Sequence, residues 1–284
     1  MKKIAVVNRT NLKNYGSVLQ CYALCAAVAD LGYDSEIIFQ EGNLSKNFDF
    51  RPMKMLSSVF KLLMHPGLIS STMVNVKDMQ SRKITDETVR LFDTFVQEEI
   101  TQKKYTHRQL VRVAKSNEYA KCICGSDQIW CSTTLYVDPL MYLRFAPKTK
   151  RIAYAPSIGR DFIPRYNRRK MKKYINDIPF LSVRETEGAR LIKQLTGRDA
   201  QVVLDPTLLR QKADWDKLKR AVDTPNNYVL CYFLDAPSAQ TQTHIAAYAK
   251  EMGAEIVALG YALPDCENEG VTVHYPDCGP REFL

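Results

Sequence analysis

The alternation of short apolar runs with helical stretches constrains the fold of this chain more than any other feature. Residues 4–7, for example, are apolar throughout, as strands buried on both faces of a parallel sheet are. Between such runs, apolar residues recur at helical spacing, as in residues 17–31, where Ser17 is the predicted N-cap. Strands that alternate with helices form βαβ units, so we predict an α/β fold with a parallel sheet. The predicted strands are residues 3–8, 35–39, 119–124, 150–155, 180–183, 201–204, 228–233 and 254–259.

The length of 284 residues predicts two domains, and the turn-rich residues 223–227 are a candidate hinge. We predict a Rossmann-like domain at residues 1–210. Within it, residues of about 41–117 are a predicted helical insertion, with helices at 55–64, 73–96 and 106–116. Residues 211–284 would begin a second Rossmann-like domain. Because residues 279–284 have the composition of a first helical turn, we expect this domain to be truncated.

Composition and charge exclude several classes of protein. The net charge of +9 is compatible with nucleic acid, a membrane surface or an anionic small substrate. No aromatic platform or recognition helix accompanies it, so we predict no nucleic-acid partner, and the basic residues 165–173 are predicted to form a solvated helix face. No apolar stretch approaches the ~18 residues of a spanning helix, so we predict no membrane span. Most of the eight cysteines lie in apolar runs, which predicts reduced thiols and a cytoplasmic protein. Their spacing and that of the four histidines fits no metal site.

Polar or special residues follow several of the predicted strands. The sequence Gly125-Ser126-Asp127 follows one strand, and Arg184 follows another. Because ligands bind at the carboxyl ends of strands in open α/β sheets, we expect these groups to share one site. The alternative for the glycine-containing segment is an ordinary turn, since turns favour the same residues. The remaining members of this set are Asn14 and Gly16, which precede the first helix, and Ser157 and Asp205.

Five segments in this order resemble the polysaccharide pyruvyl transferase family. They are residues 14–24, 125–130, 154–159, 182–188 and 203–209. The resemblance implies two Rossmann-like domains that face each other, as in glycosyltransferases of the B type. It also implies transfer of a pyruvate ketal from phosphoenolpyruvate to a sugar of a cell-surface polysaccharide, with no cofactor. A lipid-linked form of the acceptor is left open. Members usually continue into a Ser-Phe-His-Gly segment with a phosphate-binding histidine, which would follow Leu284.

This chemistry suggests a role for each candidate residue. Phosphoenolpyruvate carries a phosphate and a carboxylate, and the guanidinium of Arg184 would clamp either group, although pairing with Glu185 or Glu187 is the alternative. Asp127 would orient or deprotonate an acceptor hydroxyl, or only cap a turn. Trp130 would stack on a sugar or lie in the core. Asp205 is predicted to fix the turn before Pro206. The predicted lining residues of the site are Asn14, Gly16, Gly125, Ser126 and Ser157.

Two other functions remain open from the sequence. A glycosyltransferase that uses a nucleotide sugar could have the same architecture. A non-catalytic carbohydrate-binding protein of this fold is the other alternative. Neither a P-loop nor a nucleophile elbow nor a dinucleotide-binding glycine motif is present in the sequence.

Overall fold

The computed structural model describes residues 2–8, 13–40, 52–69 and 84–284. The chain separates into two compact units. The first contains residues 1–64 and 95–215, and the second contains residues 65–94 and 216–284. Each unit has its own parallel sheet and its own hydrophobic core. The division into domains at residues 210 and 211 remains a prediction.

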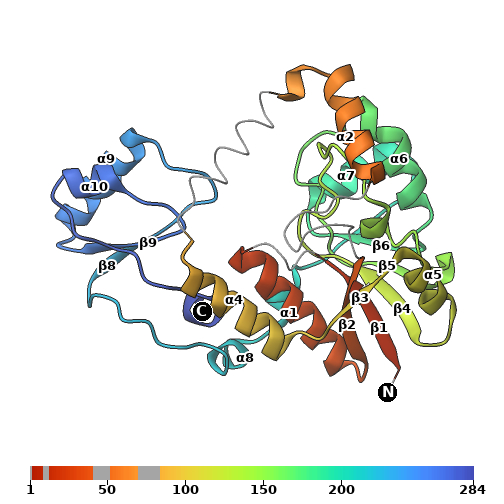
Figure 1. The fold of residues 1–284 in the computed structure, drawn as a ribbon, viewed down its shortest axis with the longest axis horizontal. Coiled ribbons are helices and arrows are strands. Elements are labelled where there is room, and N and C mark those ends of the chain that lie inside the picture. The colour runs from red at the N-terminus through yellow and green to blue at the C-terminus, as the bar shows by residue number, and fades with distance from the viewer. Residues whose placement is uncertain (1, 9–12, 41–51, 70–83) are drawn as a thin grey trace. The chain divides into compact units, whose positions relative to one another are not determined.

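The first unit is built on a seven-stranded parallel sheet (Figure 1), which confirms the predicted α/β class. The strand order is β3-β2-β1-β4-β5-β6-β7. The first six positions match the order of doubly wound nucleotide-binding folds, in which ligands bind where the order reverses. Here the reversal lies between β1 and β4. The strands are β1 Lys3–Val7, β2 Asp34–Gln40, β3 Gln102–Tyr105, β4 Tyr119–Cys124, β5 Arg151–Ala153, β6 Phe180–Val183 and β7 Gln201–Val202.

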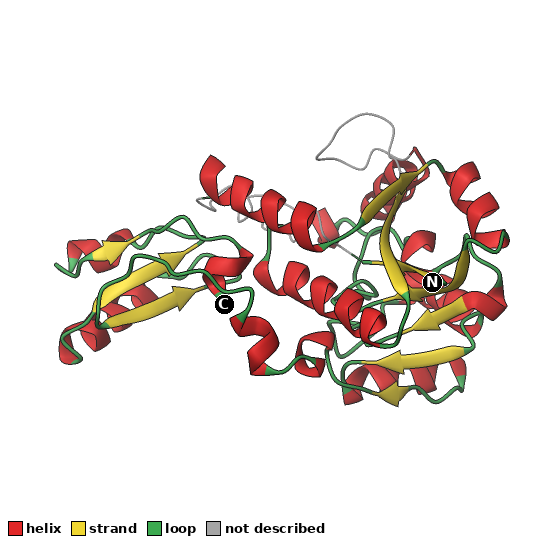
Figure 2. Ribbon diagram, turned by 90° about the horizontal axis from the view of Figure 1, so that it is seen from below, coloured by secondary structure: helices red, strands yellow, loops and turns green. Residues whose placement is uncertain are grey.

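Helices cover both faces of this sheet (Figure 2). On one face, α5 (His107–Lys115), α6 (Arg165–Asn176) and α7 (Thr186–Thr196) pack against alternate strand residues in a continuous core. On the other face lies α1 (Tyr15–Asp30). Three short 3-10 helices complete the unit, η1 (Pro139–Tyr142), η2 (Lys148–Lys150) and η3 (Pro206–Leu209).

The N-cap of α1 is Asn14 and not the predicted Ser17. The Asn14 side chain accepts a hydrogen bond from the backbone N–H of Ser17 over 2.9 Å. Ser17 therefore lies in the first turn, and its hydroxyl donates to Asp127 instead of capping the helix. Helix α5 lies within the helix predicted at residues 106–116, and its N-cap Thr106 forms a reciprocal capping box with Gln109.

The predicted helical insertion contains a strand, which corrects that part of the sequence interpretation. Strand β3 pairs in parallel with β2 and forms the edge of the sheet. Its residues 102–104 are polar and exposed, so no apolar pattern marks it. Helices α2 (Pro52–Met64) and α4 (Asp86–Glu99) agree with the helical part of the prediction. Most of residues 73–85 of the second predicted helix lie outside the described residues.

The second unit contains a parallel three-stranded sheet in the order β10-β9-β8. Its core forms between the sheet and α9, with Ala246, Ala249 and Ile256 fully buried. The elements are β8 Tyr228–Tyr232, α9 Ala239–Glu251, β9 Glu255–Leu259, α10 Pro264–Asn268, β10 Val273–His274 and α11 Pro280–Phe283; α8, Lys212–Asp216, lies at the boundary of the units. Among the described helices of the chain, none is long and apolar enough to span a membrane.

Candidate functional site

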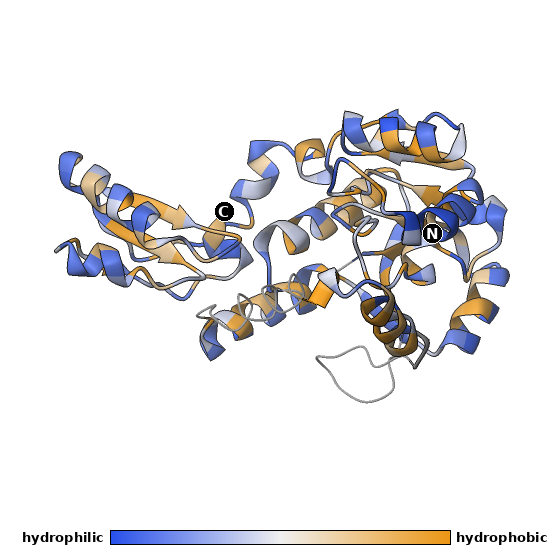
Figure 3. Ribbon diagram, turned by 90° about the horizontal axis from the view of Figure 1, so that it is seen from above, coloured by the Kyte–Doolittle hydropathy of each residue, from blue (hydrophilic) through white to orange (hydrophobic). Residues whose placement is uncertain are grey.

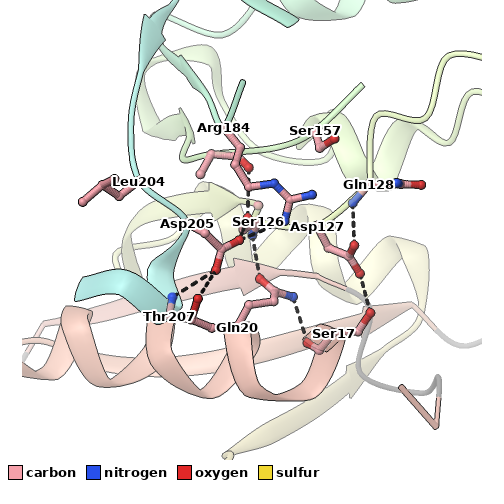
Figure 4. A network of polar contacts seen from close by, with 12 residues as sticks. Ser17, Gln20, Ser126, Asp127, Gln128, Ser157, Arg184, Leu204, Asp205 and Thr207 are labelled. Carbon is pink, nitrogen blue, oxygen red and sulfur yellow. Dashed lines mark hydrogen bonds and ion pairs between the residues drawn. The ribbon is translucent and has the colours of Figure 1, made fainter. Parts of the chain in front are cut away.

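Ser126 lies at the centre of a polar network at the carboxyl end of the large sheet (Figure 4). Its hydroxyl is 2.8 Å from Asp205 Oδ2 and 3.0 Å from the carbonyl oxygen of Ala155. Its backbone N–H donates to Gln20 Oε1 over 3.1 Å. The residue is completely buried. Ser126 therefore joins the ends of β4 and β5, the segment after β7, and helix α1.

Arg184 joins this network from the end of β6. Its Nη1 donates to Asp205 Oδ2 over 2.9 Å, and one third of its side chain is exposed. The second oxygen of Asp205 accepts the backbone N–H of Thr207 over 3.0 Å and the Thr207 hydroxyl over 2.8 Å, so the predicted turn-fixing role of Asp205 is confirmed. The same carboxylate also holds Arg184 in place.

The ionised form of Asp205 is favoured by its partners. Burial by itself raises the pKa of this carboxyl, because it penalises the charged form. The hydrogen bonds from Thr207, Arg184 and Ser126 outweigh burial, and the pKa of Asp205 lies below its ordinary value. The site thus contains a guanidinium–carboxylate pair at neutral pH.

Asp127 lies next to this pair and is partly accessible. Its Oδ2 accepts the hydroxyl of Ser17 over 2.5 Å, and its Oδ1 accepts the backbone N–H of Gln128 over 2.7 Å. The residue has φ of 62°, in the left-handed region that aspartate tolerates better than most side chains. Each carboxylate oxygen therefore has a fixed partner, which sets the orientation of the side chain.

Gly125 is required by packing between adjacent chain segments. A Cβ atom at this position would lie 1.8 Å from the backbone oxygen of Tyr154, and φ is 129°. Gly125 is one of the predicted lining residues of the site. In the structure, the neighbour that excludes a side chain at this position is the backbone directly after β5.

A second group of amides supports the site from beneath. Asn8, directly after β1, donates from Nδ2 to Gln20 Oε1 over 3.0 Å and to the carbonyl oxygen of Gly125 over 2.8 Å. Gln20 Nε2 donates to the carbonyl oxygen of Ser17 over 2.8 Å. The sequence analysis missed Gln20. The feature that could have indicated Gln20 is a long polar side chain between apolar positions of α1. In the structure, Gln20 is only 3% exposed.

The other predicted residues are near the network but have local partners. Asn14 caps α1. Gly16 lies two residues later, and a Cβ atom added there would be in ordinary van der Waals contact with Asn14 Oδ1, 3.5 Å away. Ser157 is buried; its backbone N–H donates to the Asp127 carbonyl oxygen over 2.8 Å, and its Oγ accepts from Gly159 N over 3.0 Å. Residues 9–12 of the first loop lie outside the described residues.

Trp130 is a core residue, which corrects the predicted stacking on a sugar. The side chain is completely buried, and its ring stacks on Tyr142 with centroids 5.0 Å apart. Its indole N–H donates to the carbonyl oxygen of Met141 over 2.9 Å. No ring face is left for a ligand. Among the described residues, no group of three or more histidine, cysteine or acidic side chains is arranged to hold a metal ion.

A parallel α/β sheet with polar groups gathered where its strand order reverses defines a domain of the doubly wound class, whose members bind ligands at that edge. The chain belongs to the polysaccharide pyruvyl transferase family, since the family model of that description matches residues 14–284. Membership implies a transferase that adds pyruvyl groups to polysaccharide. Neither a curated protein nor a solved structure matches the chain.

Proposed function

We propose that this chain transfers a pyruvate ketal from phosphoenolpyruvate to a sugar of a cell-surface polysaccharide, in the cytoplasm. The observation that carries the proposal is the convergence of Arg184, Asp205, Ser126 and Asp127 at one edge of the sheet. These residues come from separate strand ends, and the edge is where ligands of doubly wound folds bind. Family membership supports pyruvyl transfer, and phosphoenolpyruvate is the donor that this proposal adds.

Arg184 is the proposed anion clamp. One of its N–H groups is engaged by Asp205, while a third of the side chain remains accessible for a phosphate or carboxylate. A guanidinium offers these groups two parallel hydrogen bonds, so holding it in one orientation favours a single mode of donor binding. Asp205 compensates part of its charge. The donor therefore also needs the positive end of the α1 dipole, which lies at Tyr15 beside the site.

Asp127 is the proposed group that accepts a proton from the acceptor sugar. In the reaction, protonation of the donor methylene gives positive character at C2, and a sugar hydroxyl adds there and loses its proton. A second hydroxyl of the same sugar then forms its own bond to C2 as the C2–O bond to phosphate breaks, and it too loses a proton. Ser17 and the Gln128 backbone orient the Asp127 carboxylate for the first of these steps.

The remaining elements of the proposal concern the acceptor and the second unit. The parallel sheet β10-β9-β8 supports a second Rossmann-like domain, as in glycosyltransferases of the B type. Of the predicted lining residues, Asn14, Gly16, Gly125 and Ser157 would shape the site through the backbone turns that they form. The acceptor is a saccharide, in free or lipid-linked form, and no cofactor takes part.

Donor binding and phosphate release test the proposal together. We expect phosphoenolpyruvate to raise the melting temperature of the chain, and phosphate to be released when a suitable glycan is added. Arg184→Ala should remove the stabilisation. Arg190→Ala is the matched control, because Arg190 is an exposed arginine of α7 whose partners among the described residues are Glu187 of its own helix and the Asp161 carbonyl oxygen.

Two results would contradict it. Stabilisation by a nucleoside diphosphate and not by phosphoenolpyruvate would favour a nucleotide-sugar glycosyltransferase. Saccharide binding that Arg184→Ala leaves unchanged, with no phosphate release from any acceptor of a broad panel, would favour a non-catalytic carbohydrate-binding protein.

A further inference from the structure

Helix α2 presents most of its described apolar side chains outward and Lys61 inward. Leu56, Phe60 and Leu63 are 66%, 65% and 73% exposed, whereas Lys61 is only 8% exposed. Figure 3 colours most of the helix as hydrophobic. The exposed apolar residues recur at the i, i+3, i+4, i+7 spacing of one helical face: Leu56, Val59, Phe60 and Leu63. A surface helix of a globular protein normally has the opposite arrangement.

Lys61 makes polar inward contacts from α2. Lys61 Nζ donates to Asn167 Oδ1 of α6 over 2.6 Å and lies 5.1 Å from the ring centre of Tyr166. Asn167 is itself buried and donates to the carbonyl oxygens of Ser132 and Thr134 over 2.7 and 2.9 Å. These contacts attach α2 to α6 without using the apolar face, which is therefore available to another surface.

Helix α6, to which α2 is attached, is strongly basic. Its twelve residues include six cations and no acidic residue. All six lie at exposed positions: Arg165, Arg168, Arg169, Lys170, Lys172 and Lys173. The sequence of α2 also contains no acidic residue. An apolar stripe beside a concentrated positive charge is the pattern by which interfacial helices bind anionic bilayers.

A cavity on the α7 side of α6 also combines positive charge with apolar side chains. It has a volume of about 440 Å³ and is lined by the cations Arg168, Arg169 and Lys172 together with the apolar Ile163, Leu191 and Leu195. The cations of this lining could bind the phosphate of a lipid headgroup, while the apolar side chains could contact its glycerol.

We propose that α2 and α6 form a docking surface for an anionic lipid bilayer. The apolar stripe of α2 enters the headgroup region, and the cations of α6 bind lipid phosphates. A second copy of the chain is a poorer occupant, because it would bring two sets of α6 cations together. The proposal does not depend on the donor or on the chemistry at Asp127, so its failure and that of the proposed function are distinguishable.

Sedimentation with lipid vesicles tests the docking surface. We expect the chain to bind vesicles of phosphatidylcholine mixed with phosphatidylglycerol. Vesicles of phosphatidylcholine alone should bind at least tenfold more weakly, because each cation that contacts an anionic lipid contributes about fivefold to the affinity. High salt should weaken the binding. The double variants Phe60→Ser/Leu63→Ser and Arg169→Gln/Lys172→Gln should each reduce it by about tenfold or more. Tyr248→Ser/Met252→Ser, which removes two apolar side chains that are about half exposed near the end of α9, is the control.

A second measurement locates the contact. The fluorescence of Leu63→Trp, after subtraction of the wild-type signal, should shift to the blue when anionic vesicles are added. Three results would overturn the proposal: no vesicle binding by the wild type, binding of both double variants that is as strong as that of the wild type, or loss of binding in the presence of competing RNA with no blue shift. Self-association that Phe60→Ser/Leu63→Ser abolishes, without vesicle binding, would assign the apolar face to a second copy.

Discussion

The Ser126 hydroxyl lies 2.8 Å from Asp205 Oδ2, although 79 residues separate the two in the chain. The same oxygen accepts the guanidinium of Arg184 over 2.9 Å. One carboxylate thus joins the residues that follow β4, β6 and β7. The position of Arg184, and with it the proposed anion site, depends on this shared oxygen.

We expect Asp205→Asn to destabilise the first unit by about 2 kcal/mol, because it leaves a partly buried guanidinium without its counter-charge and weakens the turn at Thr207. Urea unfolding measures the loss. A double-mutant cycle with Ser126→Ala should give a coupling energy of about 1 kcal/mol, since the two side chains share one hydrogen bond. Additive effects of the two substitutions would contradict the shared network.

The contribution of Asp205 should also depend on pH. Its pKa is lowered in the folded state, so the stabilisation is fully present above the unfolded value of about 3.9 and is lost as pH falls through the folded pKa. The difference in stability between the wild type and Asp205→Asn should therefore shrink in acid. Unfolding curves at several pH values below 5 check the sign, and a difference that grows toward low pH would contradict it.

Asp127 and Ser17 should differ in what their substitution does to turnover. Asp127→Asn should lower kcat by about 100-fold or more, while stabilisation by phosphoenolpyruvate persists, because the substitution removes the base and not the anion clamp. Ser17→Ala should lower kcat by about tenfold, since the carboxylate loses one of its two orienting bonds.

Rescue by threonine separates a positioning role from structural damage. Ser17→Thr, which keeps a hydroxyl, should restore the kcat that Ser17→Ala loses. An equal fall in kcat for both variants would indicate only structural damage. Unaltered kcat for Asp127→Asn would remove Asp127 from the mechanism.

Gly125→Ala should destabilise the chain by about 4 kcal/mol or more, because its Cβ would lie 1.8 Å from the Tyr154 backbone oxygen. Gly197→Ala is the control. That residue also has positive φ, 79°, at the end of α7, but no atom lies within 4 Å of the position that its Cβ would take, so we expect a loss of only about 1 kcal/mol. Equal losses, measured by chemical unfolding, would mean that backbone strain and not the close approach is the reason for Gly125.

The apolar strands were predictable because a parallel sheet buries its central strands on both faces. Residues 4–7 are thus apolar throughout, and residues 119–124 are apolar apart from Lys121; the chain order places both runs in βαβ units. Strand β3 was not predictable in this way, since an edge strand with three exposed polar residues has no such pattern. Its pairing with β2 depends on the tertiary fold.

At the site, the strand ends were predictable but the contacts between them were not. Asp127, Arg184 and Asp205 follow strands, and the topology brings them to one edge of the sheet. Which carboxylate pairs with Arg184 depends on side-chain distances: the structure gives Asp205 at 2.9 Å and the neighbouring Glu185 at 3.9 Å. Trp130 was open to two interpretations, because burial depends on the η1 segment that covers it.

Lys61 offers a test of the inverted packing of α2. Burial, and then the positive charge of Lys170, lower the pKa of Lys61 to about 8. Between this value and the ordinary value of 10.5, the unfolded chain binds more protons at this lysine than the folded chain does. The stability of the wild type should therefore rise across this window relative to Lys61→Met, which cannot titrate.

Below pH 8, Lys61→Met avoids the cost of a buried charge, although it leaves Asn167 Oδ1 without this donor. Lys173→Met removes an exposed lysine of α6 and is the control. The measurement is chemical unfolding between pH 7 and about 10.5, and a wild type that loses stability relative to Lys61→Met as pH rises would contradict a buried, polar inner face of α2.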